Sequence, residues 1–275
     1  MRASLSFCGV VAVVLAVTAV ALAGQGSSTR LAVYPNAIVA LGHSGVTGWN
    51  SDPAHPRIDV PANSWVTGTN PKVDSLYLRI LARNPRIKGH NVDLGVDGST
   101  VDDLIPQARQ AVALKPAPGL VVIDTVDNDI HCDGTDEQNY APFGATLSQA
   151  LTIISKRLPT ARILIVSSPW SSVRQFNGAV AKMPGGRESL EGTGLCDPFD
   201  PSGKVLPAHW AYLQKITDGY YAVLAATCRR FPACRYDHGA LAHLPVVPAD
   251  ITPDFNHLTV RGQRKVAALE WPFVR

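Results

Sequence analysis

Charged residues are scarce in this chain, and those present are scattered. Asp, Glu, Lys and Arg make up 17% of the 275 residues, and the formal net charge is only +3 at pH 7. A protein that binds nucleic acid through its phosphates usually carries a block of Lys and Arg, and the sequence contains none. Nucleic acid is therefore excluded as the expected partner.

Cysteine is also infrequent, and its spacing argues against a zinc site. The chain has five cysteines, without a Cys-x2-Cys pair and without a His-x3-His pair to accompany them. Structural zinc sites are built from such short spacings. The sequence therefore predicts no metal site.

Internal repeats, low-complexity tracts and a second domain boundary are absent as well. The chain has a length suited to one large domain, and 46% of its residues are hydrophobic. This composition is typical of a globular protein with a proper core. We therefore expect a single folded domain, and we expect it to be a monomer.

The N-terminal segment has the layout of a secretory signal peptide. Arg2 precedes an apolar stretch from about Phe7 to Val20, and Ala21-Leu22-Ala23 follows as a small-x-small cleavage site. We therefore expect residues 1–23 to be a cleaved signal peptide. The alternative is an uncleaved membrane anchor, although the apolar stretch is short beside the roughly 20 residues that span a bilayer.

Cleavage after residue 23 would release the rest of the chain outside the cell. The small and polar residues 24–35 predict a flexible lead-in. The folded domain is then expected over residues 36–275. The protein is predicted to be secreted, without stable insertion into a membrane.

Export changes what the other cysteines imply. An even number of cysteines in an oxidising compartment suggests two disulfides, and Cys132, Cys196, Cys228 and Cys234 follow the signal peptide. Four cysteines allow three pairings. Cys228 and Cys234 are close in sequence, which favours a local bridge between them. Cys132 would then pair with Cys196.

Strand-like and helix-like segments alternate along the chain. Short apolar runs that end at turn residues predict strands over 37–41, 90–96, 119–126 and 161–169. The segment CRYDHG, residues 234–239, is a candidate for a fifth strand. Apolar residues at helical spacing predict helices over 73–83, 143–158 and 207–231 and from about Val260. Ser99 and Asp102 have the spacing of a capping box, so a further helix is expected to begin there.

This alternation predicts an α/β protein with helices on both faces of one parallel sheet. Sites in such proteins form beyond the carboxyl ends of the strands. Ser44 follows the first predicted strand, and Asp127 and Asn128 follow the third. These three residues are therefore expected at the functional edge of the sheet.

A serine becomes a nucleophile when a histidine takes its proton and a carboxylate orients that histidine. Asp254 and His257 are three residues apart in a segment that leads into the last helix. Residues at this spacing lie on one side of a helical turn. With Ser44, they predict a catalytic triad.

Acyl transfer also needs donors that face the developing oxyanion. Gly98 follows the second predicted strand and leaves its N–H accessible, and Asn128 carries a side-chain amide. The N–H of Ser44 itself would be a third donor. Ser44, Gly98 and Asn128 therefore form the predicted oxyanion hole.

Four segments together resemble the sequence blocks of the SGNH hydrolases, also called GDSL esterases or lipases. In order along the chain they read ALGHSGVTG, NVDLGVDGST, VVIDTVDNDI and DFNHLTVRG. The resemblance covers most of the chain after the signal peptide. It implies a flavodoxin-like three-layer α/β/α sandwich with a central, mainly parallel five-stranded sheet.

The resemblance also implies a role for each residue of the predicted site. Ser44 is the nucleophile, His257 the general base and Asp254 its orienting carboxylate. Gly98 and Asn128 complete the oxyanion hole with the Ser44 amide. No cofactor is required.

Two positions depart from the family pattern. The first block of the family usually reads Gly-Asp-Ser, and here His43 precedes the nucleophile. Asp127 stands where the third block usually has glycine, and a negative charge there would oppose an oxyanion. The G-x-S-x-G motif of classical α/β-hydrolases does not fit, because Val46 stands at the position of its second glycine.

The sequence therefore predicts a secreted serine esterase or lipase that acts on carboxylic esters. The substrate is expected to be a small-molecule ester, a lipid or an acylated glycan, and residues 171–205 are expected to shape the acyl pocket. One alternative is a carbohydrate O-acetylesterase. The other is a non-catalytic or weakly active binding protein on the same fold.

Overall fold

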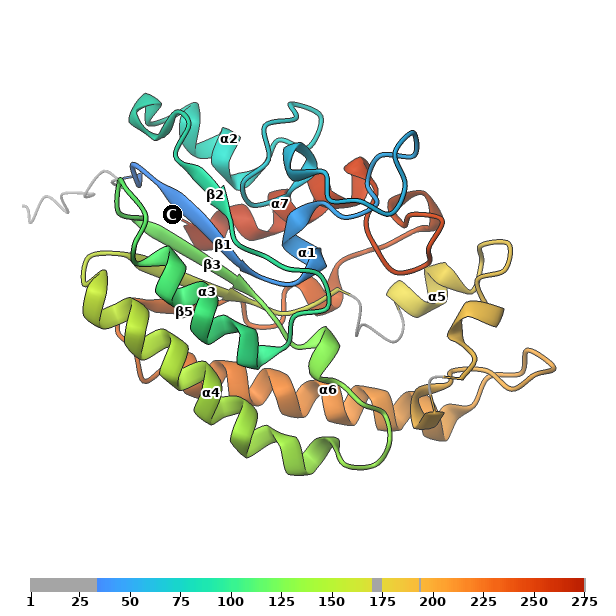
Figure 1. The fold of residues 1–275 in the computed structure, drawn as a ribbon. Coiled ribbons are helices and arrows are strands. Elements are labelled where there is room, and N and C mark those ends of the chain that lie inside the picture. Colours follow the sequence, from blue (N-terminus) through green and yellow to red (C-terminus); the bar gives the residue numbers. More distant parts are fainter. Residues whose placement is uncertain (1–33, 170–174, 193, 275) are drawn as a thin grey trace, which may run out of the picture. The chain divides into compact units, whose positions relative to one another are not determined.

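The computed structural model describes residues 34–169, 175–192 and 194–274, so the predicted signal peptide lies outside the described residues. Five strands form one sheet in the order β2-β1-β3-β4-β5, with every neighbouring pair parallel (Figure 1). The strands are β1 Ile38–Gly42, β2 Asn91–Asp93, β3 Leu120–Asp124, β4 Arg162–Val166 and β5 Cys234–Tyr236. The predicted parallel α/β architecture is confirmed.

Helices cover both faces of the sheet. They are α1 Ser44–Thr47, α2 Leu76–Leu81, α3 Leu104–Ala111, α4 Asp136–Arg157, α5 Phe176–Val180, α6 Pro207–Cys228 and α7 Val260–Val274. Helices α2 and α7 lie on one face, and α3, α4 and α6 lie on the other (Figure 1). Within the described ranges, no helix is both long and apolar enough to cross a membrane.

Side chains from the two faces of the central strands pack into two separate hydrophobic cores. Successive side chains of a strand point to opposite faces, so Ile38 and Ala40 pack with α2 and α7, whereas Val39 and Leu41 pack with α3, α4 and α6. All four side chains are buried. A strand covered on both faces reads as a continuous apolar run, which is why the strands were predictable from sequence.

Several predicted bounds differ from the observed ones, and two of these differences have a clear physical reason. Helix α4 begins at Asp136, whereas the sequence predicted a start at residue 143. The prediction missed the first two turns because they are polar and carry no apolar periodicity. The buried Asp136 accepts hydrogen bonds from the backbone N–H groups of His131 and Cys132. The capping box is formed by Thr100 and Asp103 and not by the residues one position earlier, Ser99 and Asp102.

Both predicted disulfides are present. Cys132 pairs with Cys196 and Cys228 pairs with Cys234, with Cα–Cα distances of 5.6 and 5.4 Å. The second bridge joins the end of α6 to the start of β5. The first joins two long loops that are 64 residues apart in sequence. Cys132 is therefore not available as a thiol nucleophile.

The strand order places a switch point between β1 and β3. In sheets of this order, the connections that leave these two strands pass to opposite faces, and a crevice opens between them at the carboxyl ends. Ser44 begins α1 directly after β1, and Asp127 and Asn128 follow β3. The topology thus brings together the segments that sequence reasoning assigned to the site.

A cluster of buried carboxyl groups lies between α7 and the sheet. Glu270 has no solvent exposure, and neither of its carboxylate oxygens has a hydrogen-bond partner within the described part of the chain. Burial, together with the nearby Asp237 and Asp124, raises the pKa of Glu270 to about 9. Glu270 is therefore held protonated at neutral pH.

We expect the variant Glu270→Gln to become more stable relative to wild type as pH rises. The glutamate of the unfolded chain ionises near its ordinary pKa, whereas the folded chain resists ionisation up to about pH 9. Across that window the unfolding free energy of the wild type thus falls by up to about 1.4 kcal/mol per pH unit. The Glu270→Gln variant has no ionisable group at this position and does not show this loss.

Urea unfolding of both proteins at about pH 5, 7 and 8.5 measures this difference. Glu188→Gln, at an exposed glutamate, is the matched control and should show no trend with pH. A stability difference that stays constant over the whole range for Glu270→Gln would contradict the expectation.

Candidate active site

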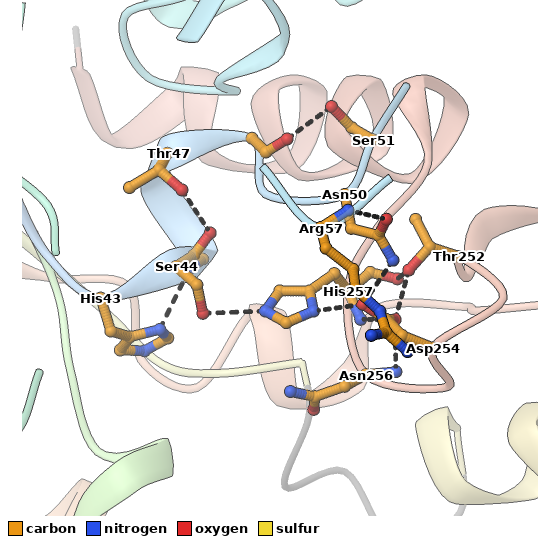
Figure 2. Close-up of polar contacts among 12 residues, drawn as sticks. His43, Ser44, Thr47, Asn50, Ser51, Arg57, Thr252, Asp254, Asn256 and His257 are labelled. Carbon is orange, nitrogen blue, oxygen red and sulfur yellow. Dashed lines mark hydrogen bonds and ion pairs between the residues drawn. The ribbon is translucent and has the colours of Figure 1, made fainter. Parts of the chain in front are cut away.

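Three residues from distant parts of the chain form a continuous hydrogen-bonded relay (Figure 2). The Oγ atom of Ser44 lies 2.8 Å from Nε2 of His257, and Nδ1 of His257 lies 2.8 Å from Oδ2 of Asp254. Ser44 and His257 are 213 residues apart in sequence. The order of contacts is that of a nucleophile, a base and an orienting carboxylate.

The relay sets the direction of proton transfer. A carboxylate accepts hydrogen bonds, so the contact with Asp254 places the proton of a neutral His257 on Nδ1. The lone pair on Nε2 then faces the hydroxyl of Ser44 and accepts its hydrogen bond. In this tautomer His257 is ready to remove the proton of Ser44.

Within the described part of the chain, Asp254 accepts hydrogen bonds from five donors, one of which is Nδ1 of His257. Its Oδ1 accepts from Thr252 Oγ1 at 2.5 Å and from the backbone N–H groups of Asn256 and His257, while Asn50 Nδ2 donates to Oδ2 at 2.6 Å. Partial burial acts to raise the pKa of Asp254, but the hydrogen bonds from His257, Thr252 and the backbone outweigh it and hold the pKa well below its usual range. Sequence reasoning missed Asn50 and Thr252, since neither matches a motif.

The turn that presents Ser44 depends on Gly42. This residue has φ +133°, and a Cβ atom there would lie 1.8 Å from the carbonyl oxygen of Asp124 on the neighbouring strand. The side chain of Gln107 closes two hydrogen bonds with it, since Oε1 accepts from the Gly42 N–H at 2.7 Å and Nε2 donates to its carbonyl at 2.9 Å. Gln107 therefore positions the turn, a role that the sequence did not reveal.

His43 takes over the local hydrogen bonding of the turn. Its Nδ1 accepts from the N–H of Gly45 at 3.0 Å and so caps α1. The proton of the neutral ring is then on Nε2, which lies 3.4 Å from Asp127 Oδ2 and 3.7 Å from Asp124 Oδ1. Burial, with a smaller contribution from His257, lowers the pKa of His43 to about 4. His43 is therefore neutral at pH 7. Its ring nitrogens are directed towards Gly45 and Asp127, so it is not placed to act as a second base for Ser44.

Asp127 lines the same cavity as Ser44 and does not carry a full charge at neutral pH. Burial raises its pKa to about 7; a hydrogen bond from Ser168 opposes this shift and the nearby Asp129 adds to it. Burial also raises the pKa of Asp124 well above its ordinary value. Below pH 7 the Asp127 carboxyl is therefore largely protonated and carries little negative charge.

Asn128 and Gly98, which were predicted as oxyanion donors, differ in their surroundings. Asn128 lines the same pocket as Ser44, and its Nδ2 donates one hydrogen bond to the carbonyl of Ser99 at 2.9 Å. A side-chain amide has a second N–H to offer. Gly98 is exposed, with φ +71°, and it is not among the described residues that line the pocket.

A cavity of about 750 Å³ opens over the relay. Polar side chains on its wall include His131, Asp133, Asn177 and Asn256. Apolar groups on its wall include Ile130, Leu190, Leu195, Pro198, Leu213 and the Cys132–Cys196 disulfide. Among the described residues, no group of three or more His, Cys, Asp or Glu side chains is placed to hold a metal ion.

The chain has the fold of the SGNH hydrolases. It is similar to a family 3 carbohydrate esterase from Clostridium thermocellum, with 12% identity, coverage of 86% of this chain and 92% of that chain, and a TM-score of 0.50. It is also similar to a putative GDSL-like lipase from Parabacteroides merdae, with 14% identity, coverage of 87% of this chain and 95% of that chain, and a TM-score of 0.50. An acetyl xylan esterase is similar at 13% identity, with coverage of 86% of this chain and 100% of that chain, and a TM-score of 0.51. At these identities the similarity defines the fold. No protein-family model and no curated protein match the sequence.

We expect the turnover rate to fall as Asp127 ionises. The pKa of this carboxyl is about 7, so the group gains negative charge above that pH and then opposes an oxyanion formed in the same pocket. The variant Asp127→Asn cannot gain this charge. Its kcat for an activated ester should therefore stay level between about pH 6.5 and 8.5, where that of the wild type declines.

Asp133→Asn is the matched control for this pH profile. Asp133 also lines the pocket, but its hydrogen bonds with Thr135 lower its pKa, so it stays ionised over the whole range. Its replacement should leave the shape of the profile unchanged. A wild-type profile identical to that of Asp127→Asn would show that this charge has no influence on turnover.

Proposed function

We propose that the protein is a secreted serine esterase that hydrolyses carboxylic esters. The observation that carries the proposal is the relay of two 2.8 Å contacts from Ser44 through His257 to Asp254 at the rim of a cavity. The SGNH hydrolase fold supports it, because the relay lies where the topology of this sheet opens a crevice.

Acylation begins when Ser44 Oγ attacks the carbonyl carbon of the ester while its proton moves to His257 Nε2. The carbonyl oxygen becomes an oxyanion, and Asp254 stabilises the imidazolium. The intermediate collapses, the bond to the alcohol oxygen breaks, and Nε2 returns the proton to the departing alcohol. Ser44 is left as an acyl ester.

Deacylation repeats the same steps with water. Nε2 of His257 removes a proton from a water molecule as its oxygen attacks the acyl carbon. The second oxyanion then collapses, the bond from the acyl carbon to Ser44 Oγ breaks, and Nε2 returns its proton to Oγ, which releases the carboxylic acid and restores Ser44. All the groups that move a proton belong to this chain, so the mechanism needs no metal and no cofactor.

The N–H groups of Ser44 and Gly98 and the side-chain amide of Asn128 are proposed to stabilise the oxyanion. The bond from Asn128 to the Ser99 carbonyl supports the assignment, because it fixes the amide next to the segment that contains Gly98. The open space around Gly98 supports it too, since a carbonyl oxygen can approach its backbone.

A carbohydrate O-acetylesterase is the second candidate. Two of the similar structures are named a carbohydrate esterase and an acetyl xylan esterase. The polar side chains of Asn177, Asn256 and Asp133 on the cavity wall offer hydrogen bonds that suit a sugar. A non-catalytic binding protein on the same fold is the remaining alternative, and labelling of Ser44 by a serine-reactive probe would exclude it.

The proposed protein is a secreted monomer with residues 36–275 as its catalytic domain and 24–35 as a lead-in. The two disulfides support an oxidising compartment, because such bonds persist outside the cytosol.

Ser44→Ala should abolish hydrolysis of p-nitrophenyl acetate and labelling by a fluorophosphonate probe. The loss follows from removal of the attacking oxygen, and we expect a decrease in kcat of at least about 10³-fold with an unchanged melting temperature. Ser202→Ala, at an exposed serine outside the cavity, is the control and should keep full activity. Undiminished turnover in Ser44→Ala would refute the nucleophile.

Secretion predicts a mature protein that begins at Gly24. Expression of the full chain in a host able to export it, followed by N-terminal sequencing of the protein in the medium, tests the cleavage site. A full-length protein that stays with the membrane fraction would instead support the uncleaved anchor.

A further inference from the structure

A third apolar cluster lies beneath the cavity, separate from the two cores on the sheet. It contains the buried residues Cys196, Leu213 and Ile216, with Ile130 and Cys132 packed against them. Leu213 is only 7% exposed, yet it also lines the cavity. One wall of the cavity is therefore the surface of a packed apolar cluster and not a single isolated apolar side chain.

The Cys132–Cys196 disulfide holds this wall next to the reacting groups. Cys132 comes four residues after Asn128, and the bridge attaches it to the 3₁₀ turn Gly194–Cys196. The N–H of Leu195 also donates to the Cys132 carbonyl at 3.0 Å. These links tie the position of Leu195 to the segment that contains the oxyanion donor.

Leu195 is a large apolar side chain that is left 42% exposed while it lines the cavity. Exposed leucine alone is common on protein surfaces. Here it lines the same cavity as Ile130 and Leu213, so its exposed surface adds to the apolar part of a concave wall. Such a surface gains free energy when apolar ligand surface covers it.

The chemistry of the relay divides the cavity into an alcohol side and an acyl side. His257 Nε2 must reach the oxygen of the departing alcohol, so the alcohol lies on the side of His257 and its neighbour Asn256 (Figure 2). The acyl group then uses the rest of the cavity, whose wall includes Ile130, Leu213 and the disulfide. The chain that follows Asn128 leads directly to Ile130 and the disulfide.

We propose that the substrate is an ester of a medium-length, unbranched fatty acid, with its acyl chain lying along Ile130, Leu195 and Leu213. This inference rests on the proposed function and narrows its substrate class. An acetyl group is too small to cover these side chains, whereas the cavity volume of about 750 Å³ accommodates a longer chain. Asn256 and Asn177 face the more polar alcohol part.

A chain-length series of p-nitrophenyl esters tests the proposal on the intact secreted protein. We expect kcat/KM to rise by at least about tenfold from acetate to octanoate, since each buried methylene group contributes about three- to fourfold. Equal or higher kcat/KM for acetate, or a preference for acetylated xylan over the octanoate, would overturn the assignment.

Two variants of Leu195 test the wall itself, and the exposure of this side chain makes both compatible with folding. Leu195→Ser should lower kcat/KM for octanoate by about tenfold and for acetate by less than about twofold, because only the longer chain reaches the residue. Leu195→Trp should fill part of the cavity and move the preferred ester to a shorter chain. Equal losses on both esters would overturn the role of Leu195.

Val247→Ser is the control, because Val247 is similarly exposed at 41% and does not line this cavity. It should leave the chain-length profile unchanged. Hydrolysis of acetate with labelling of Ser44 but no chain-length preference would overturn this inference alone. Absence of both hydrolysis and labelling would overturn the proposed function, and this inference with it.

Discussion

The parallel pairing of β1 with β3 is the constraint on which the site depends. Gly42 lies opposite Asp124 in the register of the two strands, so both strands end at the same level of the sheet. A Cβ atom at position 42 would collide with the Asp124 carbonyl oxygen, and only glycine permits this closeness together with the left-handed backbone of the turn. Because the strands end together, Ser44 and Asn128 reach one cavity wall.

The electrostatics of the site follow from burial more than from the number of charges. His43, Asp124 and Asp127 form a group of titratable side chains at the turn that presents Ser44. Burial lowers the pKa of His43 and raises the pKa of both carboxyls, so all three groups move towards their neutral forms. Asp254 behaves oppositely, because its hydrogen bonds stabilise its charge. The relay thus keeps one firmly ionised carboxylate, beside a second carboxyl whose charge depends on pH.

His43 supplies hydrogen bonding to the turn that presents Ser44. The first sequence block of the SGNH hydrolases, which this chain resembles, usually has aspartate at this position. In the structure Nδ1 accepts from the Gly45 N–H, as a short acidic side chain can at a helix start. The ring then turns its other nitrogen towards Asp127 on the segment after β3. Two substitutions in separate blocks are therefore neighbours in space.

Sequence reasoning succeeded where the determinant is local. Apolar runs located β1, β3 and β4, and the short separation of Cys228 from Cys234 indicated the disulfide pairing. The start of α4 was missed because its first turns lack apolar periodicity, and the capping box was displaced by one residue because Ser99 and Thr100 offer the same chemistry. Gln107, Asn50 and Thr252 were missed because their partners lie far away in the chain, on segments that no spacing connects.

The chemical groups of the site, their order along the chain and the three-residue spacing of Asp254 and His257 are readable without coordinates. The contact of 2.8 Å between His257 and a serine 213 residues away arises from the packed fold, and so does the pKa near 7 of Asp127. The physical reason is that local spacing restricts backbone geometry over one or two turns. Closure of a distant contact and loss of solvent around a carboxyl both require the whole packed sheet and its helices.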